Sequence, residues 1–242
     1  MMPGLFLRAI HAVLFTNPYT IDNKLEFTSE FIRNVSRIFS NDPNILTAPQ
    51  NAPPQVPRIE IRNPDQSYIA QFGQNHIAFM YQDTRNLHPT LVSLFPHFFE
   101  CLNCEVQSTM EFINPRILRL GCVIRLITEI GSSANKYLSE EVFKENLFSD
   151  AHEINIGILH KISLENFIVN RWVRYQTLRN ANDPTLDYAL SIDIDLNTLS
   201  EQMYDFTVSE ILNFFKLSFE HVTTSLSNFP LLKMGTDNDS SG

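Results

Sequence analysis

The feature that most constrains the fold is a set of long segments in which apolar and polar residues alternate. Residues 116–130 (RILRLGCVIRLITEI) are the clearest example, because Leu120, Cys122 and Ile124 alternate with small or charged residues. A period of two places the apolar side chains on one face of a β-strand. We therefore predict a strand with one face buried and the other face polar.

Other segments have the same character and are separated by turn-forming residues. We predict further strands at residues 5–16, 57–63, 67–82, 152–162, 165–179 and 187–197. The residue types of Asn63, Pro64, Asp65 and Gln66 suit a tight turn, so the second and third of these strands form a predicted hairpin. The last three strands have short connections, which predicts an antiparallel meander.

Helices are predicted where apolar residues recur every three or four positions. These segments run from Phe27 to Ile38 and over residues 89–103, 139–148 and 207–226. Thr28 or Ser29 is the expected cap of the first helix, and Pro96 is expected to kink the second. The last helix has the strongest signal, because Thr207 and Glu210 have the spacing of a capping box.

The order of these elements predicts an α+β protein of two similar lobes. Each lobe is a mainly antiparallel sheet packed with helices, ordered strand-helix-strand-strand-helix and then strand-helix-three strands-helix. We place the N-terminal lobe at residues 1–110, the C-terminal lobe at 111–234 and a flexible tail at 235–242. Residues 43–57 contain five prolines and predict a surface linker inside the first lobe.

Composition limits the classes of protein to consider. The 242 residues include 19 Phe and are 43% hydrophobic, which is enough for a large core, and the net charge of −9 disfavours nucleic acid. Three cysteines without a disulfide pattern fit a reducing compartment. Charged residues such as Arg8 interrupt the apolar runs before they reach membrane-spanning length. We expect a cytoplasmic protein that has no cofactor and does not enter a membrane.

The segment "HFFECLNC" contains the candidate metal ligands. His97, Cys101 and Cys104 have the spacing of one helix face, but structural zinc requires a fourth ligand. Cys122 is the only other cysteine, and no compact histidine pair could complete the set. A reactive Cys-X-X-Cys pair normally begins at a helix N-terminus, whereas this pair lies near a predicted C-terminus. We interpret the two thiols as packing groups rather than a metal or redox site.

Asp193 and Asp195 in "SIDIDLN" are the candidate catalytic residues. Alternate residues of a strand share a face, so the two carboxylates stand about 7 Å apart and could hold Mg²⁺ or Mn²⁺. His160 or Glu153 from a neighbouring strand would assist a metal-dependent phosphodiesterase or nuclease. The other interpretation is that arginines of the preceding strand form ion pairs with both carboxylates.

Aromatic and arginine residues are interleaved in the same region and form the candidate binding residues Arg171, Trp172, Arg174 and Tyr175. Such a face can stack on single-stranded bases, although the negative total charge favours aromatic side chains packed in the core. The chain contains no Gly-X-Ser-X-Gly, P-loop or dinucleotide-binding motif. We therefore expect a non-enzymatic protein that binds a macromolecule, either another protein or a second copy of itself.

Three stretches carry a family resemblance: "YIAQFGQNHIAFMY", "RILRLGCVIRLITEI", and "ALSIDIDLN" followed by "TVSEILNFFKLSFEHVTTSL". Together they resemble a family of similar length that is found sporadically in bacteria and archaea and has no assigned function. The family's middle strand usually reads Leu-Arg-Tyr-Ile-Asn, whereas residues 123–127 read VIRLI here, without the Tyr and Asn. The resemblance implies a prokaryotic, cytosolic accessory protein linked to mobile or defence loci, and it supplies no catalytic residue.

Overall fold

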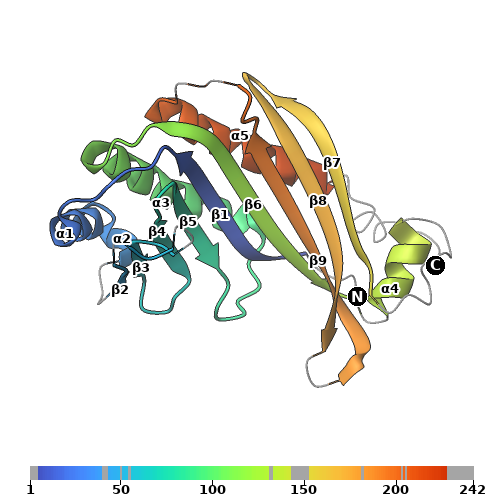
Figure 1. The fold of residues 1–242 in the computed structure, drawn as a ribbon. Helices are drawn as coiled ribbons and strands as arrows, with labels where there is room; N and C mark the ends of the chain where they lie inside the picture. Colours follow the sequence, from blue (N-terminus) through green and yellow to red (C-terminus); the bar gives the residue numbers. More distant parts are fainter. Residues whose placement is uncertain are drawn as a thin grey trace.

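The described strands of the protein form a single antiparallel sheet. The computed structural model describes residues 5–39, 43–49, 51–53, 56–130, 133–142, 153–180, 183–202, 204 and 206–227. The strands are β1 (Phe6–Thr16), β2 (Asn44–Thr47), β3 (Ile59–Arg62), β4 (Tyr68–Phe72), β5 (His76–Gln82), β6 (Ile117–Glu129), β7 (Asn155–Leu164), β8 (Phe167–Asn180) and β9 (Asp183–Thr198). Their order in the sheet is β2-β3-β4-β5-β1-β6-β9-β8-β7 (Figure 1).

The predicted α+β class is confirmed, whereas two lobes with separate sheets are not what the structure shows. The first half of the chain contributes β2-β3-β4-β5-β1 and the second half β6-β9-β8-β7, so in each half the first strand lies beside the last. β1 and β6 then pair along their lengths and join the halves edge to edge. The predicted boundary at residues 110 and 111 falls in the last turn of α3 (Leu91–Phe112). The division into two lobes stays a prediction, and residues 235–242 lie outside the described part.

Two corrections concern the first half. The predicted strand 67–82 is two strands, β4 and β5, and Gly73 begins the turn between them, with its N–H donating to His76 O (2.8 Å). The residues on both sides of this turn are apolar, so the sequence pattern did not reveal the turn. The predicted linker 43–57 contains β2, whose four residues are all exposed and which pairs with β3. Backbone pairing without side-chain burial leaves no periodic signal, so β2 was missed.

The helices agree with prediction in type but differ at their ends. They are α1 (Lys24–Asn34), α2 (Ser36–Phe39), α3 (Leu91–Phe112), α4 (Ala134–Tyr137) with a π-helical turn (Leu138–Val142), and α5 (Val208–Ser227). The cap of α1 is Asn23, whose side chain accepts from the Glu26 N–H, instead of Thr28 or Ser29. The capping box of α5 is confirmed by reciprocal bonds between Thr207 and Glu210. Residues 143–148 of the predicted third helix lie outside the described part.

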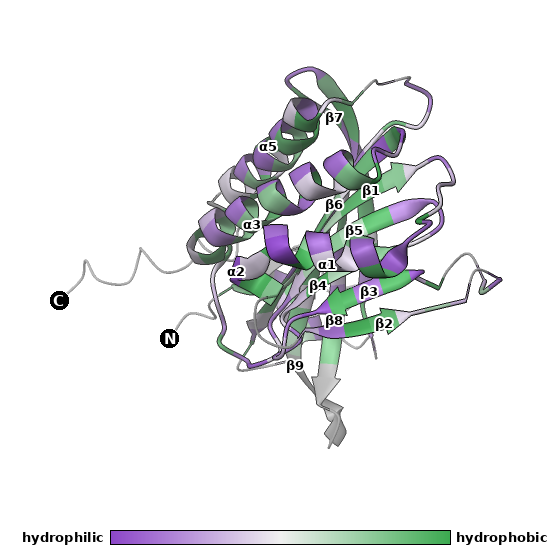
Figure 2. Ribbon diagram, turned by 90° about the vertical axis from the view of Figure 1, so that its left-hand side faces the viewer, coloured by the Kyte–Doolittle hydropathy of each residue, from purple (hydrophilic) through white to green (hydrophobic). Residues whose placement is uncertain are grey.

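The helices α1, α3 and α5 lie on one side of the sheet (Figure 2). Phe219 of α5 is fully buried, and its ring centroid lies 4.3 Å from that of Phe95 and 5.9 Å from that of Phe98, both on α3. Aromatic packing therefore joins the two long helices above the centre of the sheet. The opposite face of the sheet has no described helix over it. No described helix is long and apolar enough to cross a membrane.

Candidate functional site

Asp193 and Asp195 stand on the face of the sheet without helices, and each lies beside an arginine. Arg125 of β6 binds Asp193 with two parallel bonds, Nε to Oδ1 and Nη2 to Oδ2, both 2.8 Å long. Arg174 of β8 places its Nη2 3.7 Å from Asp195 Oδ2, and the Asn197 amide also donates to Asp195. The pair of Arg174 with Asp195 matches the ion-pair interpretation, whereas the partner of Asp193 is Arg125 of β6 and not an arginine of the preceding strand.

The surroundings of Asp195 do not complete a metal site. Burial raises the pKa of its carboxyl group, while the Asn197 amide and the Arg174 and Arg119 charges oppose that rise. His160 lies on the other face of the sheet, because it is opposite Arg171 in the register while Asp195 is opposite Trp172. Within the described residues, no group of three His, Cys, Asp or Glu side chains could hold a metal ion.

A shallow hollow of about 310 Å³ lies beside the two ion pairs, Arg125 with Asp193 and Arg174 with Asp195. It is lined by Val13, Phe15, Arg119, Gly121, Val123, Asn170, Trp172, Asp195 and Asn197. A Cβ atom at Gly121 would lie 2.7 Å from Asn197 Oδ1 and 3.2 Å from Phe15 Cε2, so the hollow depends on glycine at this position. The Arg119 guanidinium lies over the Phe15 ring at 4.0 Å from its centroid, which leaves the aromatic face covered.

The four predicted binding residues of β8 divide between the two faces. Trp172 and Arg174 are on the open face, where the Arg174 guanidinium is 5.4 Å from the Trp172 ring centroid. Arg171 and Tyr175 face the helices, and Tyr175 is buried. Alternation along a strand requires this division, so the four residues do not form one surface.

The candidate metal ligands lie on α3. His97 Nε2 is 3.9 Å from Cys101 Sγ, and the thiols of Cys101, Cys104 and Cys122 are all free. Burial, with the nearby Glu105, raises the pKa of Cys101 to about 12. Metal binding requires a thiolate, so a thiol held in the protonated form is a poor ligand.

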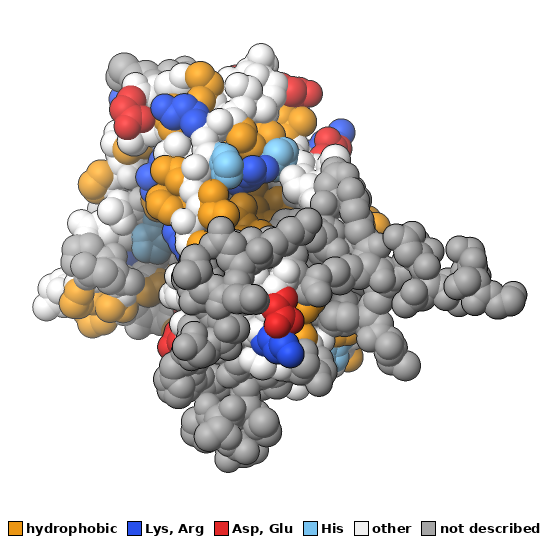
Figure 3. All heavy atoms as spheres, turned by 90° about the vertical axis from the view of Figure 1, so that its right-hand side faces the viewer, with side chains coloured by type: hydrophobic (Ala, Val, Ile, Leu, Met, Phe, Trp, Pro, Cys, Tyr) orange, Lys and Arg blue, Asp and Glu red, His pale blue; other side chains and the backbone are white. Residues whose placement is uncertain are grey.

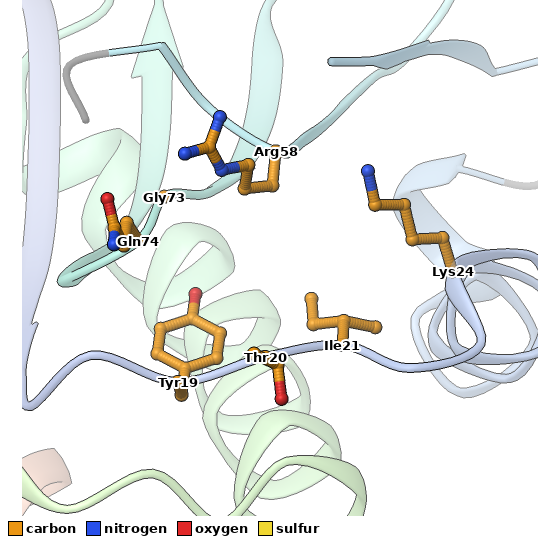
Figure 4. A pocket seen from close by; sticks show the side chains of 7 residues that line it. All are labelled: Tyr19, Thr20, Ile21, Lys24, Arg58, Gly73 and Gln74. Atoms are coloured by element: carbon orange, nitrogen blue, oxygen red, sulfur yellow. The ribbon is translucent and has the colours of Figure 1, made fainter. Parts of the chain in front are cut away.

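A pocket of about 240 Å³ lies at the other end of the sheet. Figure 4 shows Tyr19 directed into it, with Arg58 and Lys24 on other sides. Both cations already donate to backbone carbonyls, Lys24 Nζ to Ala48 O (2.7 Å) and Arg58 Nη1 to Pro49 O (2.9 Å). These bonds fasten the proline-rich segment to the body of the protein, so we assign the two cations a structural role.

The sequence did not reveal a smaller pocket between the sheet and α5. Its volume is about 140 Å³, and it is lined by Ile158, His160, Arg171, Val173, Tyr175, Ile194, His221, Val222 and Ser225. The Arg171 Nη1 lies 3.0 Å from His221 Nε2, and its Nε is buried without a hydrogen-bond partner. One sequence signal was present, because His221 and Ser225 are four residues apart and therefore share a face of α5.

β7 forms the outer edge of the sheet beside this pocket (Figure 1). It is ten residues long, whereas β2 at the opposite edge has only four. Ile158 and Leu159 of β7 are 37% and 48% exposed, and the strand contains no Asp or Glu, with Lys161 as its one lysine or arginine. Natural edge strands are usually short, charged or covered, because an open edge pairs with other chains. No described strand pairs with the outer side of β7.

Comparisons with known proteins add little to these observations. No protein-family model and no curated protein matches the chain. Among solved structures, a rolling-circle replication initiator protein from Geobacillus stearothermophilus matches with a TM-score of 0.34 and 11% identity, covering 93% of this chain and 86% of that chain. This TM-score is too low to establish a common fold, so no activity is carried over. The resemblance to a prokaryotic family of unassigned function stays a prediction.

Proposed function

We propose that the protein is a non-enzymatic binding protein that takes an extended segment of another protein chain onto the edge of β7. The observation that carries this proposal is the edge itself, with ten residues, exposed apolar side chains and no acidic residue. An added strand satisfies the free N–H and C=O groups of the edge, and the exposed side chains provide contact area. In a cytosolic accessory protein, as the family resemblance implies, such an edge would recruit the partner.

The catalytic alternative has less support. A metal-dependent phosphodiesterase would use Asp193 and Asp195, but arginine guanidinium groups lie against both carboxylates. A second set of ligands is absent among the described residues. Single-stranded nucleic acid on the open face is also weaker, because only Trp172 and Arg174 of the four β8 candidates lie there and Asp195 would repel phosphate.

Peptide display tests the proposal. Random peptides inserted in a loop of a carrier protein, so that they have no free ends, are selected against the purified protein. The double substitution Ile158→Lys and Leu159→Lys should reduce binding of the selected peptides at least tenfold, because charges on an edge strand oppose strand addition. Leu118→Lys on the central strand β6 is the matched control, since Leu118 is 42% exposed and lies away from the edge. Equal binding by both variants would refute the proposal.

Self-association is measured in the same experiment series. Native mass spectrometry of the wild-type protein and the β7 variant reports whether a second copy occupies the edge. A dimer that the β7 substitutions dissociate would show that a second copy of the chain occupies this edge. A dimer that survives them places self-association elsewhere and removes the edge as its cause.

A further inference from the structure

The pocket beside β7 contains a positive charge that no described carboxylate neutralises. The described partner of the Arg171 guanidinium is the His221 ring, and the ion pairs among the described residues do not include Arg171. Its Nε is buried and makes no hydrogen bond. Arginine stays protonated in proteins, so it cannot relieve this situation by losing its charge. An oxyanion, which a guanidinium binds with two parallel hydrogen bonds, is the natural counterpart.

Neighbouring polar groups at this end of the pocket fit the same ligand. His160 is directly opposite Arg171 in the register, and the Ser225 hydroxyl lies 3.5 Å from His221 Nε2. Burial and the Arg171 charge both lower the pKa of His221. The neutral ring can therefore accept a hydrogen bond at Nε2 from the Arg171 guanidinium, which keeps its proton. Figure 3 shows histidine and basic side chains adjacent to one another on this side of the molecule, within a mainly apolar surround.

The remaining walls are apolar and enclose little space. Ile158, Val173, Ile194 and Val222 line them, and the volume is about 140 Å³. Sites for complete small-molecule ligands usually begin at about 300 Å³. The pocket therefore fits one apolar side chain with an attached anionic group better than it fits a free cofactor.

The C-terminal residue of a protein has these properties, because it joins a carboxylate and a side chain at one carbon atom and continues into a backbone that can pair with a strand. Ile158 and His160 belong both to the pocket and to the edge strand. We propose that this pocket binds the C-terminal residue of a partner protein, with Arg171 holding the terminal carboxylate and Ile158, Val173 and Val222 contacting an apolar terminal side chain. This inference rests on the proposed function and names the part of the partner that is recognised.

The test uses eight-residue peptides that end in valine, with the other positions randomised on an array. Each peptide is made once with a free C-terminal carboxylate and once as the C-terminal amide. The best binders are then measured by fluorescence polarisation against the wild-type protein. We expect the amide to bind at least tenfold more weakly than the free acid. Equal binding of both forms would overturn the inference.

Variants of β8 locate the carboxylate. Arg171→Met should weaken the free acid at least tenfold and leave the amide unchanged, while Arg174→Met, on the same strand but the opposite face, should leave both unchanged. Circular dichroism shows whether Arg171→Met is folded, and Arg171→Lys, which keeps the charge but loses the fork, should give an intermediate loss. The inference would be contradicted if the Arg171→Met variant bound the free acid as tightly as the Arg174→Met variant does.

The two proposals fail separately. If amides bind as well as acids, but the β7 lysine substitutions still abolish binding, the edge is a peptide site and the terminal carboxylate is not recognised. If none of these peptides responds to the β7 substitutions, the edge itself is not the site. Displacement of the peptide by inorganic phosphate at an equal concentration would show a general anion site and would overturn recognition of a chain terminus.

Discussion

Apart from the additional edge strand β2, the two halves of the chain share a strand order, but they bury ionisable groups of opposite type near their long helices. In the first half Glu105 of α3 is only 2% exposed, and no described group donates a hydrogen bond to it. In the second half Arg171 of β8 faces α5 with a buried, unpaired Nε. Burial raises the pKa of Glu105 well above its ordinary value, so this carboxyl group can lose its charge by protonation. Arg171 cannot lose its charge, which is why we propose a ligand for the second half and none for the first.

The largest predicted effect tests whether the halves are one folding unit. Phe219→Ala in α5 and Phe31→Ala in α1 each remove a fully buried ring and should each reduce the free energy of unfolding by about 3–5 kcal/mol. Because β1 and β6 pair across the centre, both variants should unfold in one transition. Hydrogen exchange measured separately for β3–β5 and for β7–β9 shows whether the two sets of strands open with the same free energy. Separate transitions for the two sets of strands would instead support two independent lobes.

Glu105→Gln tests the charge in the first half. The folded-state pKa is raised above the ordinary value of 4.5, so burial of this group opposes folding progressively as the pH rises through and above 4.5. The variant should therefore be more stable than the wild type at pH 7 and equal to it near pH 4. Each kcal/mol gained raises the melting temperature by about 2–4 °C, which thermal unfolding at the two pH values detects. A variant that melts lower at pH 7 would show that Glu105 has a stabilising partner.

Removing a helix cap should reduce stability by a smaller amount, and only in the second half should this loss depend on pH. Thr90→Ala at α3 and Thr207→Ala at α5 should each cost about 1 kcal/mol at pH 7, since both threonines cap the third residue of their helix. Hydrogen bonds from Thr207 lower the pKa of Glu210. The stability that the Glu210 carboxylate contributes is therefore present above the ordinary value of 4.5 and is lost as the pH falls through the lowered pKa. Thr90 pairs with Ser93, which does not titrate in this range. Only the Thr207→Ala effect should decrease in acid.

The smallest effect concerns the ion pairs of the open face. Asp193→Asn with Asp195→Asn should change the free energy of unfolding by less than about 1 kcal/mol. The arginine side chains are 49% and 45% exposed, so solvent screens both pairs, and the aspartate side chains are only 20% and 16% exposed, so the cost of burying their charge offsets part of the attraction. Urea denaturation measures the change. A much larger loss would show that the two ion pairs contribute strongly to the stability of the second half. On the open face of the first half the corresponding position is taken by an apolar cluster of Ile69, Ala78 and Met80.

The sequence predicted elements whose signal is local and missed arrangements that depend on distant residues. β6 alternates over most of its length, and α5 has a capping box and an apolar stripe, so both were found within a few residues of their ends. β2 was missed because its side chains are exposed and only its backbone pairing with β3 defines it. The turn at Gly73 was hidden between two apolar runs, because sheet pairing on both sides buries β4 and β5 alike.

The candidate sites show the same limit. Periodicity correctly placed Asp193 and Asp195 on one face, and cross-strand pairing with arginine was one of the two interpretations. The pocket near β7 was not found, because it assembles Ile158, Arg171 and His221 from three separate elements. Their contact follows from the order β9-β8-β7 and from the path of α5 across it, neither of which a single sequence determines.

The pairing of β1 with β6 makes this chain a candidate for fragment complementation. Cleavage between α3 and β6 would leave each fragment with one long strand that is unpaired along one edge, β1 of 11 residues in the first and β6 of 13 residues in the second. The bare edges have complementary register, and the aromatic contact of Phe219 with α3 adds a second point of recognition. We expect two fragments produced from separate genes to reassemble across the centre of the sheet, which would provide a split reporter whose signal depends on the β1–β6 pairing and on the contact between α3 and α5.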